Sequence, residues 1–402
     1  MIETIIMSIK LSQRVQRIKP SPTLAVTARA ASLRAAGQDI IGLGAGEPDF
    51  DTPEHIKQAA RDAINAGKTK YTAVDGTVEL KNAIIEKFKR DNGLNYQADQ
   101  VLVSCGGKQS FFNLAQALLD DGDEVIIPAP YWVSYPDMSL LAGGVPVIVH
   151  AGQDQAFKIT PEQLEAAITE KTKLVVINSP SNPSGKAYTK AELAALGAVL
   201  IKYPNILVAT DDMYEHILWC DEPFSNIVMA CPELYNQTIV LNGVSKAYSM
   251  TGWRIGYAAG PTDLIKAMKK IQSQSTSNPT SISQYAAQAA LEGDQSCISE
   301  MLVAFKERHD YVVEQLNLIN GISCISSDGT FYCFPDFNAI LNRLDNIDND
   351  VDLAEYILEK AGVALVPGSA FGLDGHMRIS IATSMENLVN AMDRIAKLLN
   401  DN

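Results

Sequence analysis

Short apolar runs alternate with longer amphipathic stretches along the first three quarters of the chain. Residues 101–104 predict a buried strand, 108–119 an amphipathic helix, 120–123 an acidic turn and 124–127 the next strand. Further apolar runs predict strands at 174–177, 206–209, 239–241 and 254–257. Continuous apolar strands separated by helices are typical of a mostly parallel sheet covered on both faces, so we predict an α/β fold here.

The pattern changes after about residue 295. Short strands are predicted at 331–334, 363–366 and 377–380. A final amphipathic helix has an apolar face made of Leu388, Met392, Ile395, Leu398 and Leu399. These elements predict a second, smaller α+β unit.

The composition is that of an ordinary globular protein. The chain has 402 residues, 47% hydrophobic and 20% charged, which excludes a disordered chain, a collagen-like repeat and a disulfide-stabilised miniprotein. Lysine and arginine number 33 against 47 acidic residues, a net charge of −14; this charge opposes binding to nucleic acid and to anionic membranes. We expect no membrane span and no secretory signal, and Met7 is a second candidate start.

Cysteines and histidines are dispersed along the chain. None of the six cysteines forms a Cys-x-x-Cys pair, and no group of cysteines and histidines has zinc-finger spacing. We therefore expect reduced thiols, no metal site and a cytoplasmic location.

Two glycine-rich turns are candidates for anion binding. Residues 42–48 resemble a dinucleotide fingerprint only superficially, because the third glycine comes one residue early and Pro48 stands where the phosphate-binding helix should begin. Residues 105–108, Cys-Gly-Gly-Lys, lie between a predicted strand and a predicted helix, where free N–H groups can bind a phosphate. An ordinary strand–helix turn explains this second pattern equally well.

Further polar residues follow other predicted strands. A loop at 178–185 contains two prolines and a glycine, and Asp211 and Tyr214 follow the next strand, at the edge where α/β sheets bind ligands. Lys246 follows a later strand, with Arg254 eight residues further on. A lysine in a dry, positively charged pocket has a lowered pKa and can bond covalently to an aldehyde, whereas an arginine suits a phosphate.

Taken in order, these blocks resemble the class I aminotransferases of the fold-type-I pyridoxal-phosphate (PLP) family. Gly-Gly-Lys-Gln at 106–109 and Tyr-Trp-Val-Ser-Tyr at 131–135 are similar to the subgroup Iγ aspartate aminotransferases in particular. The other matching blocks are 14–20, 45–53, 68–71, 179–185, 245–246, 250–254 and 376–380.

The resemblance implies a domain organisation. Residues 1–47 would form an N-terminal arm and part of the small domain, 48–295 the large PLP-binding domain, and 296–402 the small C-terminal domain.

The resemblance also implies roles around the PLP ring. Lys246 would bind PLP covalently and then carry the proton between the substrate α-carbon and the cofactor. Asp211 would pair with the ring nitrogen, which makes the ring an electron sink. Tyr214 and Asn182 would bind the phenolic oxygen of the ring, and Trp132 would stack on its face.

The phosphate of PLP would be bound by Arg254 and by the backbone of Gly106 and Gly107. Tyr71 would reach the phosphate of the neighbouring subunit, so the resemblance implies a homodimer with shared active sites.

The substrate would be held by a further set of residues. Arg378 would bind the α-carboxylate, aided by the backbone N–H of Gly46, and Trp132 and Asn182 would also contact substrate. Lys108 would bind the side-chain carboxylate of a dicarboxylic substrate.

Two departures from the family pattern are notable. Asp212 stands where the family usually has glutamate, and Gly243 stands where many relatives have a serine whose hydroxyl contacts the phosphate. Neither is expected to abolish catalysis.

Three functions remain open. The leading hypothesis is an aspartate:2-oxoglutarate aminotransferase with a ping-pong mechanism. The second is prephenate transamination to arogenate, alone or as a dual activity, with which a basic residue at Lys19 is associated. The third is a non-catalytic PLP-binding sensor, although no basic DNA-binding segment precedes residue 20.

Overall fold

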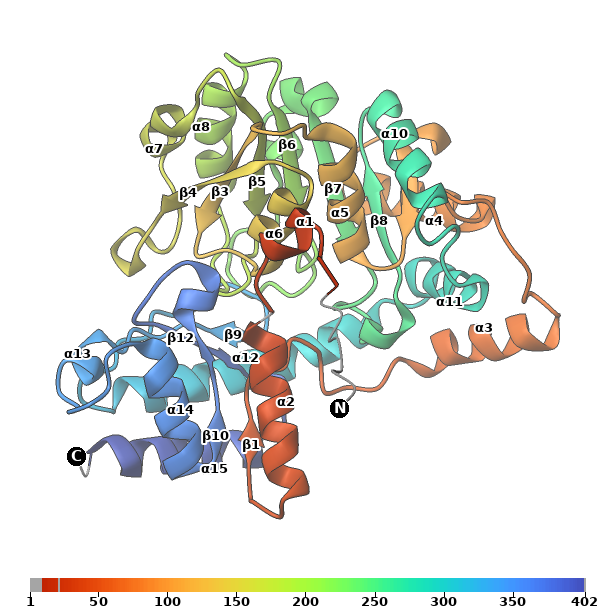
Figure 1. Ribbon diagram of the computed structural model, residues 1–402. Coiled ribbons are helices and arrows are strands. Elements are labelled where there is room, and N and C mark those ends of the chain that lie inside the picture. Colours follow the sequence, from red (N-terminus) through yellow and green to blue (C-terminus); the bar gives the residue numbers. More distant parts are fainter. Residues whose placement is uncertain (1–8, 21, 401–402) are drawn as a thin grey trace, which may run out of the picture.

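The computed structural model describes residues 9–20 and 22–400 (Figure 1). The candidate start at Met7 lies outside these residues. Within them, no helix is both long and apolar enough to cross a membrane.

A large sheet forms the centre of the molecule. Among the described residues its strand order is β2-β8-β7-β6-β5-β3-β4, with β8 antiparallel to both neighbours and the other pairs parallel. The strands are β2 (Val101–Ser104), β3 (Glu124–Ala129), β4 (Val145–His150), β5 (Thr172–Asn178), β6 (Leu207–Asp211), β7 (Thr238–Gly243) and β8 (Gly256–Ala259). The predicted mostly parallel α/β architecture is confirmed; β4 was not predicted.

Helices cover both faces of this sheet because successive strand residues point to opposite sides. Val103 belongs to one apolar core and Leu102 to the other. The helices that precede or flank the sheet strands are α3 (Glu54–Asn65), α4 (Val78–Asn92), α5 (Gly107–Leu118), α6 (Ser134–Leu141), α7 (Pro161–Ala167), α8 (Lys190–Leu200), α9 (Ile227–Ala230), α10 (Thr262–Ser273) and α11 (Ser281–Glu292). Helices α5, α6 and α10 pack on one face, and α4, α8 and α11 on the other.

Local sequence signals explain several helix ends. A capping box starts α8: the hydroxyl of Thr189 accepts the N–H of Glu192 at 3.1 Å, and the carboxylate of Glu192 accepts the N–H of Thr189 at 2.8 Å. Gly93 ends α4 in the left-handed conformation, with φ 67°. Short 3-10 turns complete the connections: η1 (Ala98–Gln100), η2 (Gln153–Gln155), η3 (Pro232–Gln237), η4 (Thr251–Trp253) and η5 (Gly368–Phe371).

A second, smaller unit lies below the large sheet in Figure 1, mostly in blue. Its strands are β9 (Tyr332–Cys333), β11 (Val366–Pro367) and β12 (Met377–Ser380), in the antiparallel order β11-β12-β9, and β1 (Ile41–Gly42) pairs in parallel with β10 (Val363–Ala364). Its helices are α2 (Pro22–Ala35), α12 (Ser296–Asn317), α13 (Asn338–Leu341), α14 (Asp350–Ala361) and α15 (Met385–Asn400); the short α1 (Gln13–Gln16) contacts α6 of the large unit. The predicted strand at 363–366 is divided between β10 and β11.

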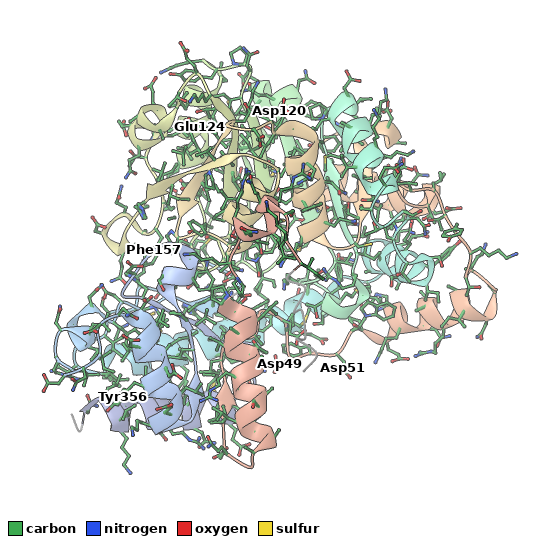
Figure 2. All side chains as sticks on the ribbon, in the orientation of Figure 1. Asp49, Asp51, Asp120, Glu124, Phe157 and Tyr356 are labelled. Atoms are coloured by element: carbon green, nitrogen blue, oxygen red, sulfur yellow. The ribbon has the colours of Figure 1, made fainter. Side chains whose placement is uncertain are left out.

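Contacts between the two units fix how they face each other. Phe157, which follows β4 and is labelled in Figure 2, packs edge-on against Phe334 of the small unit with ring centroids 5.5 Å apart. Asp49 forms an ion pair of 2.7 Å with Arg308 of α12. Because β1 pairs with β10, we propose that 1–47 contribute an N-terminal arm and part of the small domain, that 296–402 form the rest of the small domain, and that 48–295 form the large one.

Candidate active site

The carboxyl ends of β5, β6 and β7 open onto a cavity that residues of the small unit close from the other side. Its empty volume, counted with its open mouth, is about 780 Å³. The predicted site residues that line it are Gly46, Gly107, Trp132, Asn182, Asp211, Tyr214, Lys246 and Arg378. The fold therefore brings together residues that are spread over more than 300 positions of sequence.

Asp211 ends β6 at the floor of the cavity. The hydroxyl of Tyr135 in α6 donates to its Oδ2 at 2.5 Å, and the N–H of Met213 donates to its Oδ1 at 3.3 Å. The side-chain amide of Asn178 donates to its backbone carbonyl at 2.9 Å. Burial raises the pKa of Asp211, while the hydrogen bond from Tyr135 and the charge of Lys246 oppose that rise. A cation placed against this carboxylate would be strongly held.

Lys246 follows β7 and points into the same cavity, where its ammonium donates to the carbonyl of Gly46. Burial and the nearby positive charge of Arg378 lower its pKa to about 8. The neutral amine, which a nucleophile and a proton acceptor require, is therefore more populated near physiological pH than that of an ordinary lysine.

Arg378 lies on β12 of the small unit and is 3% exposed. Its Nη1 donates to Oδ1 of Asn182 at 3.0 Å, and its Nη2 donates to the carbonyl of Gly44 at 2.8 Å. Within the described residues its buried Nε has no hydrogen-bond partner. A buried guanidinium with an open donor, in a cavity, is suited to a ligand carboxylate.

A glycine turn and an arginine form a cradle beside the cavity. Gly106, with φ 88°, precedes α5, whose first residue is Gly107. A Cβ on Gly106 would lie 2.2 Å from Nη2 of Arg254, and a Cβ on Gly256 would lie 2.2 Å from the backbone N of Gly107. Only glycine permits this close approach. A helix N-terminus and a guanidinium placed together are suited to an anion, and the phosphate cradle stays a prediction.

The remaining predicted residues do not line the cavity. Gly106 and Arg254 lie in the adjoining cradle. The ammonium of Lys108 lies 5.2 Å from the centre of the Trp132 ring, and burial together with the charge of Arg254 lowers its pKa.

Two predicted residues lie further out. The side chain of Lys19 is exposed in the segment after α1. Tyr71 is 92% exposed, in the loop between α3 and α4. Its role in the site of a neighbouring subunit stays a prediction.

Among the cavity residues that sequence reasoning missed are two buried tyrosines, Tyr135 and Tyr332. Tyr135 lies within the block 131–135, and its position three residues after Trp132 was the available signal. Tyr332 lies in the apolar run 331–334, which predicts a strand of the core and gives no sign of a functional role. Both hydroxyls are buried against functional groups of the site.

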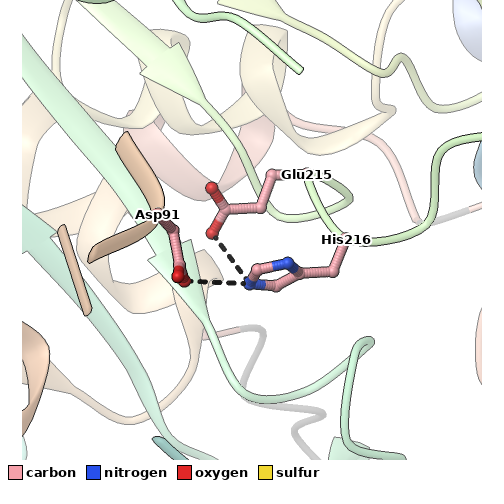
Figure 3. A group of neighbouring side chains, drawn as sticks. All are labelled: Asp91, Glu215 and His216. Atoms are coloured by element: carbon pink, nitrogen blue, oxygen red, sulfur yellow. Dashed lines mark ion pairs between the residues drawn. The ribbon is translucent and has the colours of Figure 1, made fainter. Parts of the chain in front are cut away.

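A second polar cluster lies outside the cavity lining, and sequence analysis did not anticipate it. Nε2 of His216 lies 3.5 Å from Oδ2 of Asp91 and 3.4 Å from Oε1 of Glu215. Figure 3 shows these three side chains facing one another. These side chains have the ligand atoms of a metal site. However, the buried ammonium of Lys87 already contacts Glu215, so the cluster contains its own cation, and we interpret it as an ion-pair network.

The fold and the site define the class of the protein. Residues 38–395 match the family described as aminotransferase class I and II, and the chain belongs to that family. The predicted family is thus confirmed.

Relatives of known name extend the comparison. The chain is 63% identical to an aspartate/prephenate aminotransferase of Nitrosomonas europaea, a match that covers 97% of this chain and 100% of the relative. It is 57% identical to an aspartate/prephenate aminotransferase of Cereibacter sphaeroides, over 96% of this chain and 97% of the relative. Its fold is similar to the crystal structure of the aspartate aminotransferase of Rhizobium meliloti, with a TM-score of 0.94, 50% identity, and coverage of 98% of this chain and 99% of that one.

Proposed function

We propose that the protein is a PLP-dependent aminotransferase that moves an amino group between L-aspartate and 2-oxoglutarate by a ping-pong mechanism, giving oxaloacetate and L-glutamate. The observation that carries the proposal is the meeting of Lys246, an amine of lowered pKa, with Arg378, a buried guanidinium, in one cavity. The names of the relatives agree with this activity.

The donor set of the cavity fits PLP. Lys246 suits its aldehyde, Asp211 its ring nitrogen, and Tyr214 with Asn182 its phenolic oxygen. The cradle of Gly106, Gly107 and Arg254 suits its phosphate. When bound, PLP supplies an electron sink for the negative charge that develops at the substrate α-carbon.

The chain's own groups carry out the proton chemistry. Asp211, held by the hydroxyl of Tyr135, presents a negative charge that keeps the opposite ring nitrogen protonated. The amine of Lys246 removes the proton from the substrate α-carbon and carries it to the former aldehyde carbon of the cofactor. Trp132 lines the same cavity and covers the reacting groups against water.

Arg378 selects for a carboxylate, which all amino acids share, so a dicarboxylic preference needs a second cation. We propose Lys108 for this role because its ammonium lies over the ring of Trp132, which lines the cavity. Prephenate is a second candidate substrate because relatives are named for both activities. For prephenate we propose a contribution from Lys19. This residue lies close to Asp137: burial raises the pKa of that carboxyl, and Lys19 partly offsets the rise.

We do not propose a non-catalytic sensor, since the matched relatives are named as enzymes.

We further propose a homodimer with shared active sites in a reducing compartment, the cytoplasm. The near-complete exposure of Tyr71 leaves its hydroxyl available to the site of a partner subunit. The cysteines are free and distributed over both units, which is usual for proteins of reducing compartments.

A substrate panel for Lys108→Ala tests the substrate assignment. Loss of a charged hydrogen bond should lower kcat/KM by about 10- to 150-fold for aspartate, glutamate and 2-oxoglutarate, and should spare alanine. PLP affinity should stay near that of the wild type. Lys266→Ala, which removes an exposed lysine on α10, is the matched control and should change nothing.

Two outcomes would contradict or redirect the proposal. If Lys108→Ala weakens PLP binding and all substrates equally, Lys108 serves the cofactor, and the aspartate assignment loses its main physical support. A Lys19→Ala variant that loses prephenate activity more than aspartate activity would favour the dual-substrate function.

A further inference from the structure

Tyr332 of β9 is a buried cavity residue for which the proposed function has no role. It is 1% exposed and lines the cavity. Its hydroxyl lies 3.2 Å from the hydroxyl of Tyr214, and its ring lies under the guanidinium of Arg378, with 4.4 Å between the guanidinium carbon and the ring centre. One side chain thus touches the group proposed to bind the cofactor and the group proposed to bind the substrate.

Either hydroxyl can donate in the contact between Tyr214 and Tyr332, but a bound cofactor would determine which one does. Each phenol has one proton to donate, and burial raises the pKa of both Tyr214 and Tyr332, so both stay protonated. If Tyr214 donates to the phenolic oxygen of the cofactor, its own oxygen must accept the proton of Tyr332. Within the described part of the chain, the Tyr332 hydroxyl has no other side-chain hydrogen-bond partner. The proton of the Tyr332 hydroxyl is therefore available for donation to Tyr214.

The ring contact fixes the plane of Arg378. Two of its nitrogens are held by Asn182 and by the carbonyl of Gly44. Its flat guanidinium also lies against the rings of Tyr332 and Phe371, at 4.4 and 4.9 Å. A desolvated cation over an aromatic face is attracted to it, and the face restricts tilting of the cation. Bidentate binding of a carboxylate depends on that orientation.

We propose that Tyr332 is a positioning residue with two separable roles, which rest on the function proposed above. Its hydroxyl directs the proton of Tyr214 towards the cofactor. Its ring is the platform that holds Arg378 in the plane required by the substrate α-carboxylate.

Two substitutions separate these roles in the holoenzyme. Tyr332→Phe removes the hydroxyl and keeps the ring, whereas Tyr332→Leu removes both. The first measurement is the pH midpoint of the visible absorption change of bound PLP. The second is the dissociation constant of maleate, a non-reacting dicarboxylate, from spectral titration. Phe157→Leu is the matched control, because it removes a ring packed between the two units without touching Tyr214 or Arg378.

The expected results differ between the variants. In Tyr332→Phe the midpoint should rise by about 0.4 to 1 pH unit, the effect of one neutral hydrogen bond that favours the cofactor anion, while maleate binding stays within about 2-fold of wild type. In Tyr332→Leu the midpoint should rise similarly, and maleate should bind about 5- to 30-fold more weakly. Phe157→Leu should change neither value.

Contrary results are distinguishable. A midpoint that moves in Tyr214→Phe but not in Tyr332→Phe would overturn the hydroxyl role. Equal maleate affinity in Tyr332→Phe and Tyr332→Leu, or an equal loss in Phe157→Leu, would overturn the platform role. A wild-type protein that shows no visible absorption with PLP would instead refute the proposed function itself.

Discussion

Replacement of Glu215 by glutamine would remove the negative partner of a buried ammonium. Lys87 of α4 is 1% exposed and Glu215 is 6% exposed, and their charged groups are in direct contact. The carboxylate of Glu215 also accepts the side-chain amides of Asn242 at 2.8 Å and Asn92 at 2.9 Å. Glutamine preserves the shape of the side chain but leaves Lys87 without its nearest negative partner; only the more distant carboxylate of Asp91, at 3.9 Å, remains.

The structure indicates how large the effect should be. Removal of one partner of a buried ion pair costs about 3–5 kcal/mol in the free energy of unfolding. The pKa of Glu215 has the direction that a stabilising pair requires: burial would raise it, but the charges of Lys87 and His216 lower it from 4.5 to about 2. We therefore expect a loss of about 3 kcal/mol in Glu215→Gln, at the lower end of the range for a broken buried pair because Asp91 remains near Lys87.

Urea unfolding at neutral pH measures this loss. The control is Glu54→Gln: Glu54 also pairs with a lysine, Lys57 at 3.0 Å, but is exposed to solvent, so its loss should have little effect. The double variant Lys87→Met/Glu215→Leu should recover only part of the stability: it leaves no buried ammonium without its partner, but the buried amides of Asn92 and Asn242 lose their acceptor.

The pH dependence gives a second check. A lowered pKa means that the contribution of Glu215 is fully present above its unfolded value of 4.5 and is lost as the pH falls towards about 2. The difference between wild type and Glu215→Gln should therefore shrink in that window. A stability loss no larger than that of Glu54→Gln, or a difference that stays constant between pH 5 and pH 2, would refute the reasoning.

Two further predictions concern the proposed chemistry. Lys246→Ala should retain PLP non-covalently but lose transamination, and borohydride reduction followed by peptide mapping should label Lys246 only in the wild type; near-normal turnover in the variant would contradict its role. Asp211→Ala should slow α-proton removal about 100- to 1000-fold in single-turnover experiments with little change in unfolding, because a preorganised charge is lost. Equal single-turnover rates would show that Asp211 is only a turn residue.

Many strands and helices of the large unit could be predicted from the local pattern of apolar and polar residues. The buried strand at 101–104 and the helix that follows it were predicted almost to the residue, because apolar periodicity and a glycine turn are local signals. Asp211 and Lys246 were found for a related reason: both follow buried strands, and the carboxyl ends of parallel strands meet at one edge. Such placement needs only the order of elements, which the sequence contains.

Other features were decided by tertiary packing. Tyr214 and Tyr332 are 118 positions apart, and Arg378 and Gly44 are 334 apart, so no periodicity connects them. The buried contact of Lys87 with Glu215 was equally invisible, since isolated charged residues usually indicate solvent exposure. These contacts exist because the small unit closes over the sheet edge and because α4 packs on the sheet. A sequence determines which side chains are available, whereas the packing of distant elements determines which of them lose their water and face one another.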